Sequence, residues 1–149
     1  MLLSLAIWIP IAAGLLVLAL GGDERARLQR QVAMAGAVLG FLVTIPLYTG
    51  FDASLAGMQF VQKLPWIERF QIHYHLGVDG ISVLFILLNS FITVTVVLAA
   101  WTVIESRVGQ YYAAFLILSG LLNGVFSALD ALLFYVFFEA TLIPMFIII

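Results

Sequence analysis

Cysteine is absent from the 149 residues of this chain, and histidine occurs only as His73 and His75. The lack of thiols excludes disulfides, thiolate metal sites and iron–sulfur ligation within the chain. The two histidines share one face of a strand-like segment, but no third ligand of suitable type is clustered with them, and a metal site needs three or four. We therefore expect no metal site and no redox centre here, so any electron transfer must take place on other subunits.

Charged residues are also scarce. Charged residues make up 9% of the chain and hydrophobic residues 64%, with a mean hydropathy of +1.19, whereas a soluble domain has about 25% charged residues. The net charge of −2 provides no basic surface for nucleic acid. Lys and Arg are also missing from the first 20 residues, so residues 2–20 do not resemble a cleavable signal peptide. The composition predicts a protein embedded in a lipid bilayer.

The long apolar runs that remain define the fold class. Open strands cannot cross lipid, and these runs lack the alternation of barrel strands, so we expect an all-α polytopic membrane protein. The chain then forms a single transmembrane region of about five helices, at residues 2–20, 32–48, 81–101, 111–128 and 131–149. The loop at residues 49–79 contains a short patch, residues 70–76, in which apolar and polar residues alternate as in a strand.

The basic residues predict an orientation. Loops on the cytoplasmic side of a membrane are enriched in Lys and Arg. The loops after the first and third helices carry Arg25, Arg27, Arg30 and Arg107, whereas the loop at 49–79 has only Lys63 and Arg69. We therefore expect the N-terminus and the 49–79 loop on the non-cytoplasmic side, and the Ala- and Gly-rich helices favour a bacterial inner membrane. The fifth helix ends without a polar flank, so we expect the front portion of a longer chain.

Glu139 is the most informative residue because it is the only charged group in a long apolar run. A helix beginning after Asp130 places it about 13 Å deep, near the middle of a hydrocarbon core of about 30 Å. An ionised carboxylate there costs on the order of 3 kcal/mol, and ionisable groups in membranes usually lie on ion pathways. We predict that Glu139 gains and loses a proton, the alternative being a structural carboxyl that stays neutral or paired.

Other residues near Glu139 have plausible supporting or structural roles. Pro144 cannot donate to the carbonyl of Ala140, so the helix is expected to kink and leave an acceptor for water, and Thr141 adds a hydroxyl. The alternative is that Pro144 only shapes helix packing. Asp130 directly precedes the apolar run, which is typical of an N-cap.

A polar stripe runs along the third predicted helix. Ser82, Asn89 and Thr93 fall on one face of it, and such a stripe more often packs against another helix than lines a water path. Asn123 lies in the fourth predicted helix between Gly120 and Gly124, a small-xxx-small pattern that indicates close helix contact. We expect these side chains to form hydrogen bonds between helices.

Two segments resemble a known family. Residues 74–82 (YHLGVDGIS) and residues 132–146 (LLFYVFFEATLIPMF) are similar to subunit M of NADH:quinone oxidoreductase, respiratory complex I, whose mitochondrial counterpart is NADH dehydrogenase subunit 4. The resemblance covers the whole chain, and the run after Glu139 is typical of the M type. The chain departs from the family at Thr141, where Met is frequent.

The resemblance implies a fold of fourteen transmembrane helices with two inverted repeats, of which this chain is the front part. It implies that Glu139 is the proton-pathway residue of the fifth helix, with partner lysines on later helices beyond Ile149. It also implies that the partners are other membrane-arm subunits. NAD, FMN, iron–sulfur clusters and quinone would belong to the whole complex, with quinone reached only through it and none of them held by this chain.

Two other functions stay open at this point. One is a cation/proton antiporter subunit of the same superfamily, since those proteins also carry a Glu on this helix. The other is a structural scaffold of a membrane arm, in which Glu139 only supports assembly.

Overall fold

The computed structural model describes residues 2–21, 23–52, 54, 57–70, 72–103 and 107–148. It contains five helices, α1 (Leu2–Ala19), α2 (Ala26–Thr49), α3 (Gly80–Ala99), α4 (Val108–Ser127) and α5 (Ala131–Ile148). Each is long and apolar enough to cross a membrane. Residue 71 of the expected strand patch and residue 149 of the fifth expected helix lie outside the described residues.

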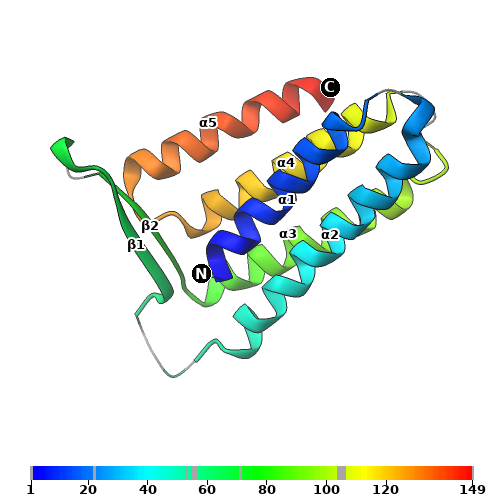
Figure 1. Cartoon of the computed structure of the whole chain (residues 1–149). Coiled ribbons are helices and arrows are strands. Elements are labelled where there is room, and N and C mark those ends of the chain that lie inside the picture. The colour runs from blue at the N-terminus through cyan, green and yellow to red at the C-terminus, as the bar shows by residue number, and fades with distance from the viewer. Residues whose placement is uncertain are drawn as a thin grey trace.

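The helices run back and forth between the two ends of one bundle (Figure 1). The N-terminus lies at the end where the two strands extend, and α5 ends at the opposite end. The central helix is α4, which packs against α1, α2, α3 and α5. In its apolar span 56% of the residues are buried, against 22% in α5, which contacts α4 along one side only. The expected all-α membrane fold is confirmed.

The second helix begins earlier than the apolar pattern suggests, at Ala26 rather than at residue 32. Its polar first turns are helical because Gln29 is buried against the end of α1 and donates from Nε2 to the carbonyl of Gly21 at 2.7 Å. Arg27 and Arg30 are therefore part of the helix, at its start. That end of the bundle is the one opposite the strands.

Two antiparallel strands, β1 (Gln59–Ile67) and β2 (Ile72–Val78), form a hairpin at the other end. The alternating patch predicted at residues 70–76 overlaps β2. The sequence of β1 gave no such signal, because its apolar and polar residues come in adjacent pairs, as in Phe60-Val61 and Gln62-Lys63, and it contains Pro65. Proline is tolerated at an edge, and the pairing register shifts between Pro65 and Ile67. The hairpin is joined to α1 through the Tyr74 hydroxyl, which accepts from Trp8 Nε1 at 2.9 Å and lies 3.0 Å from Ser4 Oγ.

Candidate functional site

Glu139 lies on the face of α5 that points away from the other helices. Its side chain is exposed, as are those of Tyr135, Ile143 and Phe146 on the same helix. It stands about 12 Å along the helix from Ala131, at 1.5 Å per residue. Among the residues that the structure describes, no hydrogen bond or ion pair reaches its carboxylate. Glu139 is thus near the middle of α5, but its side chain is not enclosed by this bundle.

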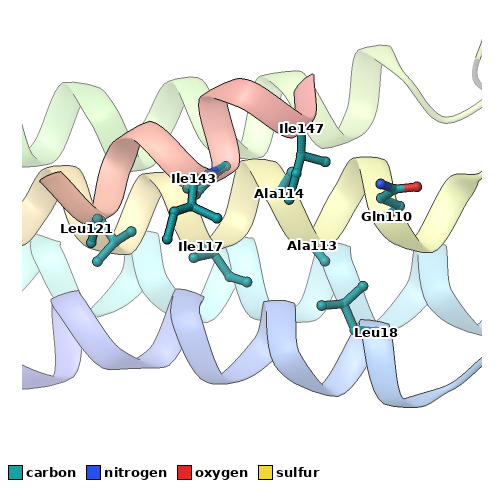
Figure 2. A pocket seen from close by; sticks show the side chains of 10 residues that line it. Leu18, Gln110, Ala113, Ala114, Ile117, Leu121, Ile143 and Ile147 are labelled. Atoms are coloured by element: carbon teal, nitrogen blue, oxygen red, sulfur yellow. The ribbon is translucent and has the colours of Figure 1, made fainter. Parts of the chain in front are cut away.

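Thr141 and Pro144 are turned toward the bundle. Thr141 is only 4% exposed, and its hydroxyl donates to the carbonyl of Phe138 at 2.5 Å. Pro144 lines a cavity of about 260 Å³ between α1, α4 and the second half of α5 (Figure 2). A rotation of about 100° per residue separates Thr141 from Glu139 by about 200°. The structure therefore does not bring the two expected supporting residues beside the carboxyl.

The polar residues of α3 and α4 do come together. Asn89 Nδ2 donates to Asn123 Oδ1 at 2.9 Å and to the carbonyl of Ser119 at 2.9 Å. Thr93 Oγ1 donates to Ser119 Oγ at 2.7 Å. These bonds join α3 to α4 near the middle of the bundle.

The same cluster reaches a third helix. Asn123 Nδ2 donates to the carbonyl of Ala6 on α1 at 3.0 Å and lies 3.4 Å from Ser90 Oγ. Its members are buried or half-buried, so the cluster provides partners for polar groups that lipid cannot solvate. Ser82 is not a member, because its backbone N–H donates to Asp79 Oδ1 at the start of α3.

Sequence reasoning missed two members of this cluster, Ser90 and Ser119. Ser90 follows Asn89 directly, and Ser119 precedes Asn123 by one helical turn, so the spacing within α4 carried a usable signal. The cluster is separate from Glu139, which faces away from α4. Amide and hydroxyl side chains do not ionise near neutral pH, so the cluster holds helices together and leaves Glu139 as the titratable carboxyl of the five spans.

Asp130 lies where the hairpin meets α5. Its Oδ2 accepts from the backbone N–H of His73 at 3.1 Å, and its Oδ1 accepts from the N–H of Leu132 at 3.0 Å and of Leu133 at 3.4 Å. The bond from His73, followed by those from the helix start, lowers the pKa of Asp130 from its ordinary value. This is N-cap geometry with an added function, because the same carboxylate ties β2 to α5.

Asp79 caps α3 in the same way, which the sequence analysis did not predict. Its Oδ1 accepts from the N–H of Ser82 at 2.8 Å, and this bond lowers the pKa of Asp79. The signal was available, since Asp79 directly precedes the apolar run of α3.

Comparison with known proteins identifies the family. The chain is 48% identical over 151 aligned residues to NADH-quinone oxidoreductase subunit M of Rhodobacter capsulatus, covering 99% of this chain and 29% of that protein. It is 41% identical to NADH-ubiquinone oxidoreductase chain 4 of Arabidopsis thaliana, covering 99% of this chain and 30% of that protein. The chain belongs to the subunit M and chain 4 family. No sequence profile of a protein family matches it.

A solved structure supports the assignment to the subunit M and chain 4 family. The fold matches a chain of respiratory complex I from Thermus thermophilus with bound NADH, with a TM-score of 0.76 and 32% identity, covering 95% of this chain and 27% of that one. The resemblance seen in the sequence is therefore confirmed. The chain spans about 30% of the length of its subunit M and chain 4 relatives.

Within this subunit M segment, the basic side chains lie away from the depth of Glu139. The basic residues inside the described spans are Arg27 and Arg30, in the first turns of α2. The other basic residues lie outside the five spans: Arg25 just before α2, Lys63 and Arg69 in the hairpin, and Arg107 just before α4. A cationic partner for Glu139 is therefore not supplied at mid-depth by the residues that the structure describes.

Proposed function

We propose that this chain is part of a proton-translocating membrane subunit of NADH:quinone oxidoreductase, in which Glu139 takes up and releases a proton. The observation that carries the proposal is a single carboxyl at mid-depth on an otherwise apolar helix, in a chain similar to subunit M along 99% of its length. Membrane carboxyls are costly and lie on ion pathways.

The energetics suit a proton carrier. An ionised carboxylate at this depth costs on the order of 3 kcal/mol, and moving one charge through 100 mV costs about 2.3 kcal/mol. A shift of one unit in proton affinity corresponds to about 1.4 kcal/mol. A neighbouring positive charge that approaches and withdraws by a few ångströms in a low dielectric changes the affinity of Glu139 by such amounts.

The proposed role implies which partners this chain has. Other membrane-arm subunits and lipid are the partners of the exposed helix faces. NAD, FMN, iron–sulfur clusters and quinone act elsewhere in the complex, so this chain belongs to an oxidoreductase without carrying its redox chemistry. The arginines before α2 and α4 favour a cytoplasmic position for that end of the bundle. The N-terminus and the hairpin then face the non-cytoplasmic side of a bacterial inner membrane.

The test replaces Glu139 by Gln in the full complex, reconstituted in sealed vesicles. We expect normal assembly on native gels, with proton pumping and NADH:quinone turnover largely lost, because Gln cannot exchange a proton. Glu139→Asp should retain part of the activity, since it keeps a carboxyl. Glu24→Gln, an exposed change outside the five helices, is the matched control and should have no effect. Full pumping by an assembled Glu139→Gln complex would refute the proposal.

A scaffold is the second candidate, and the exposed, largely apolar face around Glu139 favours it because such a face suits packing against other helices. A scaffold predicts that Glu139→Gln reduces assembly before it reduces pumping in the complexes that form. The same vesicles also test for an antiporter, since proton transport that depends on Na⁺ and needs no NADH would indicate that class.

A further inference from the structure

We propose that the contact between Phe137 and Gly124 is the positioning contact that sets the rotation of α5 and therefore the placement of the Glu139 carboxyl. The proposal rests on the proposed function of Glu139. Phe137 and Gly124 would act as positioning residues, because neither touches the carboxyl.

The ring of Phe137 occupies the space that a side chain at residue 124 would take. A Cβ atom on Gly124 would lie 2.8 Å from Cγ and Cδ1 of the Phe137 ring and 2.9 Å from Cδ2. Real Cβ atoms essentially never approach other heavy atoms that closely, so α4 has room for this ring only because residue 124 is glycine. Phe137 is 4% exposed, and its ring centroid lies 6.4 Å from that of Trp8. The ring is therefore enclosed between α4 and α1.

The enclosed ring determines where Glu139 points. Residues two positions apart on a helix differ by about 200° in direction. With Phe137 directed at Gly124, Glu139 is directed away from α4, as the exposure of its side chain shows. A rotation of α5 that expelled the ring would carry the carboxyl toward the bundle by the same angle.

The second half of α5 is packed at Thr141 and Pro144, which are buried, but part of its inward face borders open space. Its first turn is tied to the hairpin through Asp130. Beyond Phe137, Ala140, Pro144 and Ile147 border the cavity of about 260 Å³. Figure 2 shows this part of α5 lying over α4, with Ile143 and Ile147 extending from α5 toward α4 and Leu18 on the α1 side of α4. A cavity provides fewer contacts than close packing, so the contact at Gly124 is one tight constraint within a turn of Glu139.

The other partner of this contact is itself held firmly. Asn123, next to Gly124, bonds to Asn89 on α3 and to the carbonyl of Ala6 on α1. These bonds fix the rotation of α4, so Gly124 is presented to Phe137 in one orientation. Through the polar cluster and the contact at Gly124, the positions of α1 and α3 determine the position of α5.

The test uses Gly124→Ala, Phe137→Leu and the double variant in the assembled complex. Gly124→Ala adds a methyl group where the ring lies, and Phe137→Leu removes the ring, which makes room for that methyl group. Spin labels on single cysteines at Tyr135 and Thr141, in a chain that has no cysteine of its own, report the rotation of α5. The complex without these cysteines, treated with the same label, gives the background signal to subtract. Tyr135 is 57% exposed and Thr141 is 4% exposed, so the two labels should differ strongly in mobility.

We expect Gly124→Ala to reduce the difference in mobility between the two labels and to shift the pH profile of pumping by about one unit. The double variant should restore both. The titratable side chains on the elements that pack on α5 are phenols and imidazoles: Tyr111 and Tyr112 on α4, and His73, Tyr74 and His75 on β2. They do not change in these variants, so a shifted profile reports a displaced Glu139.

Gly57→Ala is the control for a glycine-to-alanine change, because a methyl group there would meet nothing within 4 Å. It should change neither the label pattern nor the pH profile. If Gly124→Ala does not assemble, Phe137→Leu alone tests the proposal, since loss of the ring should also make the label at Thr141 more mobile and shift the profile.

Unchanged labels in an assembled Gly124→Ala complex, or moved labels with an unchanged pH profile, would overturn the positioning role. Failure of the proposed function gives a different result. In that case Glu139→Gln pumps fully, while the labels still respond to Gly124→Ala.

Discussion

The hydrogen bond between Asn89 and Asn123 provides the sharpest test of how the bundle is held together. The change is Asn123→Ala in the full-length subunit. It removes two interhelical bonds of good geometry, from Asn89 Nδ2 at 2.9 Å and to the carbonyl of Ala6 at 3.0 Å. The contact with Ser90 Oγ at 3.4 Å is too long to add much.

The magnitude follows from measured interhelical bonds in membranes, which contribute on average about 0.6 and at most about 1.7 kcal/mol each. Two such bonds predict a loss of about 1 to 3 kcal/mol in the free energy of unfolding. Asn89 Nδ2 keeps a second acceptor, the carbonyl of Ser119. The buried carbonyl of Ala6 loses its bond from Asn123 and gains no helical one, because Pro10 has no N–H to donate, so we expect a loss at the upper end of this range.

The assay is reversible unfolding of the subunit in mixed micelles, with Asn89→Ala and the double variant completing a cycle. We expect a coupling of about 0.6 kcal/mol or more between the two residues. Thr95→Ala is the control, because Thr95 bonds only within its own helix, to the carbonyl of Phe91. If the Asn89 and Asn123 changes add to within about 0.3 kcal/mol, the bond contributes nothing and the reasoning fails.

Two further predictions concern the hairpin. Asp130→Ala should speed amide hydrogen exchange at both His73 and Leu133, measured by mass spectrometry, because one carboxylate accepts from both amides. Asp79→Ala is the control and should leave those two amides unchanged. Because folding lowers the pKa of Asp130, the ionised carboxylate stabilises the fold above its ordinary pKa, and this contribution is lost as the pH falls through the lowered value. Acid should therefore release the His73 amide in the native protein and have less effect in Asp130→Asn. Tyr74→Phe should make the hairpin more sensitive to protease without changing amide exchange at Leu133, since it removes only the bonds to Ser4 and Trp8. If Leu133 exchanged equally fast in this variant and in Asp130→Ala, the hairpin would not be attached separately to α1 and to α5.

Much of the fold was predictable because membrane spans are a local property of the sequence. The start of α2 was not, since its polar first turns are helical only because Gln29 is buried against α1. The strand β1 was missed because its apolar and polar residues do not alternate, and only pairing with β2, with a register shift between Gln59 and Gln62, reveals it.

The candidate site was partly predictable. The cap at Asp130 and the polar contacts of Asn89 and Asn123 follow from local patterns that the structure shows in place. The directions of Thr141 and Glu139 relative to the bundle were not predicted, although their angular separation is fixed by the helix. The hydrophobic pattern of α5 is nearly uniform around its circumference, so the pattern favours no face.

By itself, the sequence predicted a membrane protein, the five apolar spans that the structure describes and the place of Glu139 near the middle of the fifth span. Each of these depends on counting apolar residues along one helix, because lipid tolerates few polar groups. The tertiary structure alone decided which way Glu139 points. That direction depends on contacts between residues distant in the chain, above all the ring of Phe137 against Gly124, and a helix that is apolar on every side carries no local preference for one rotation.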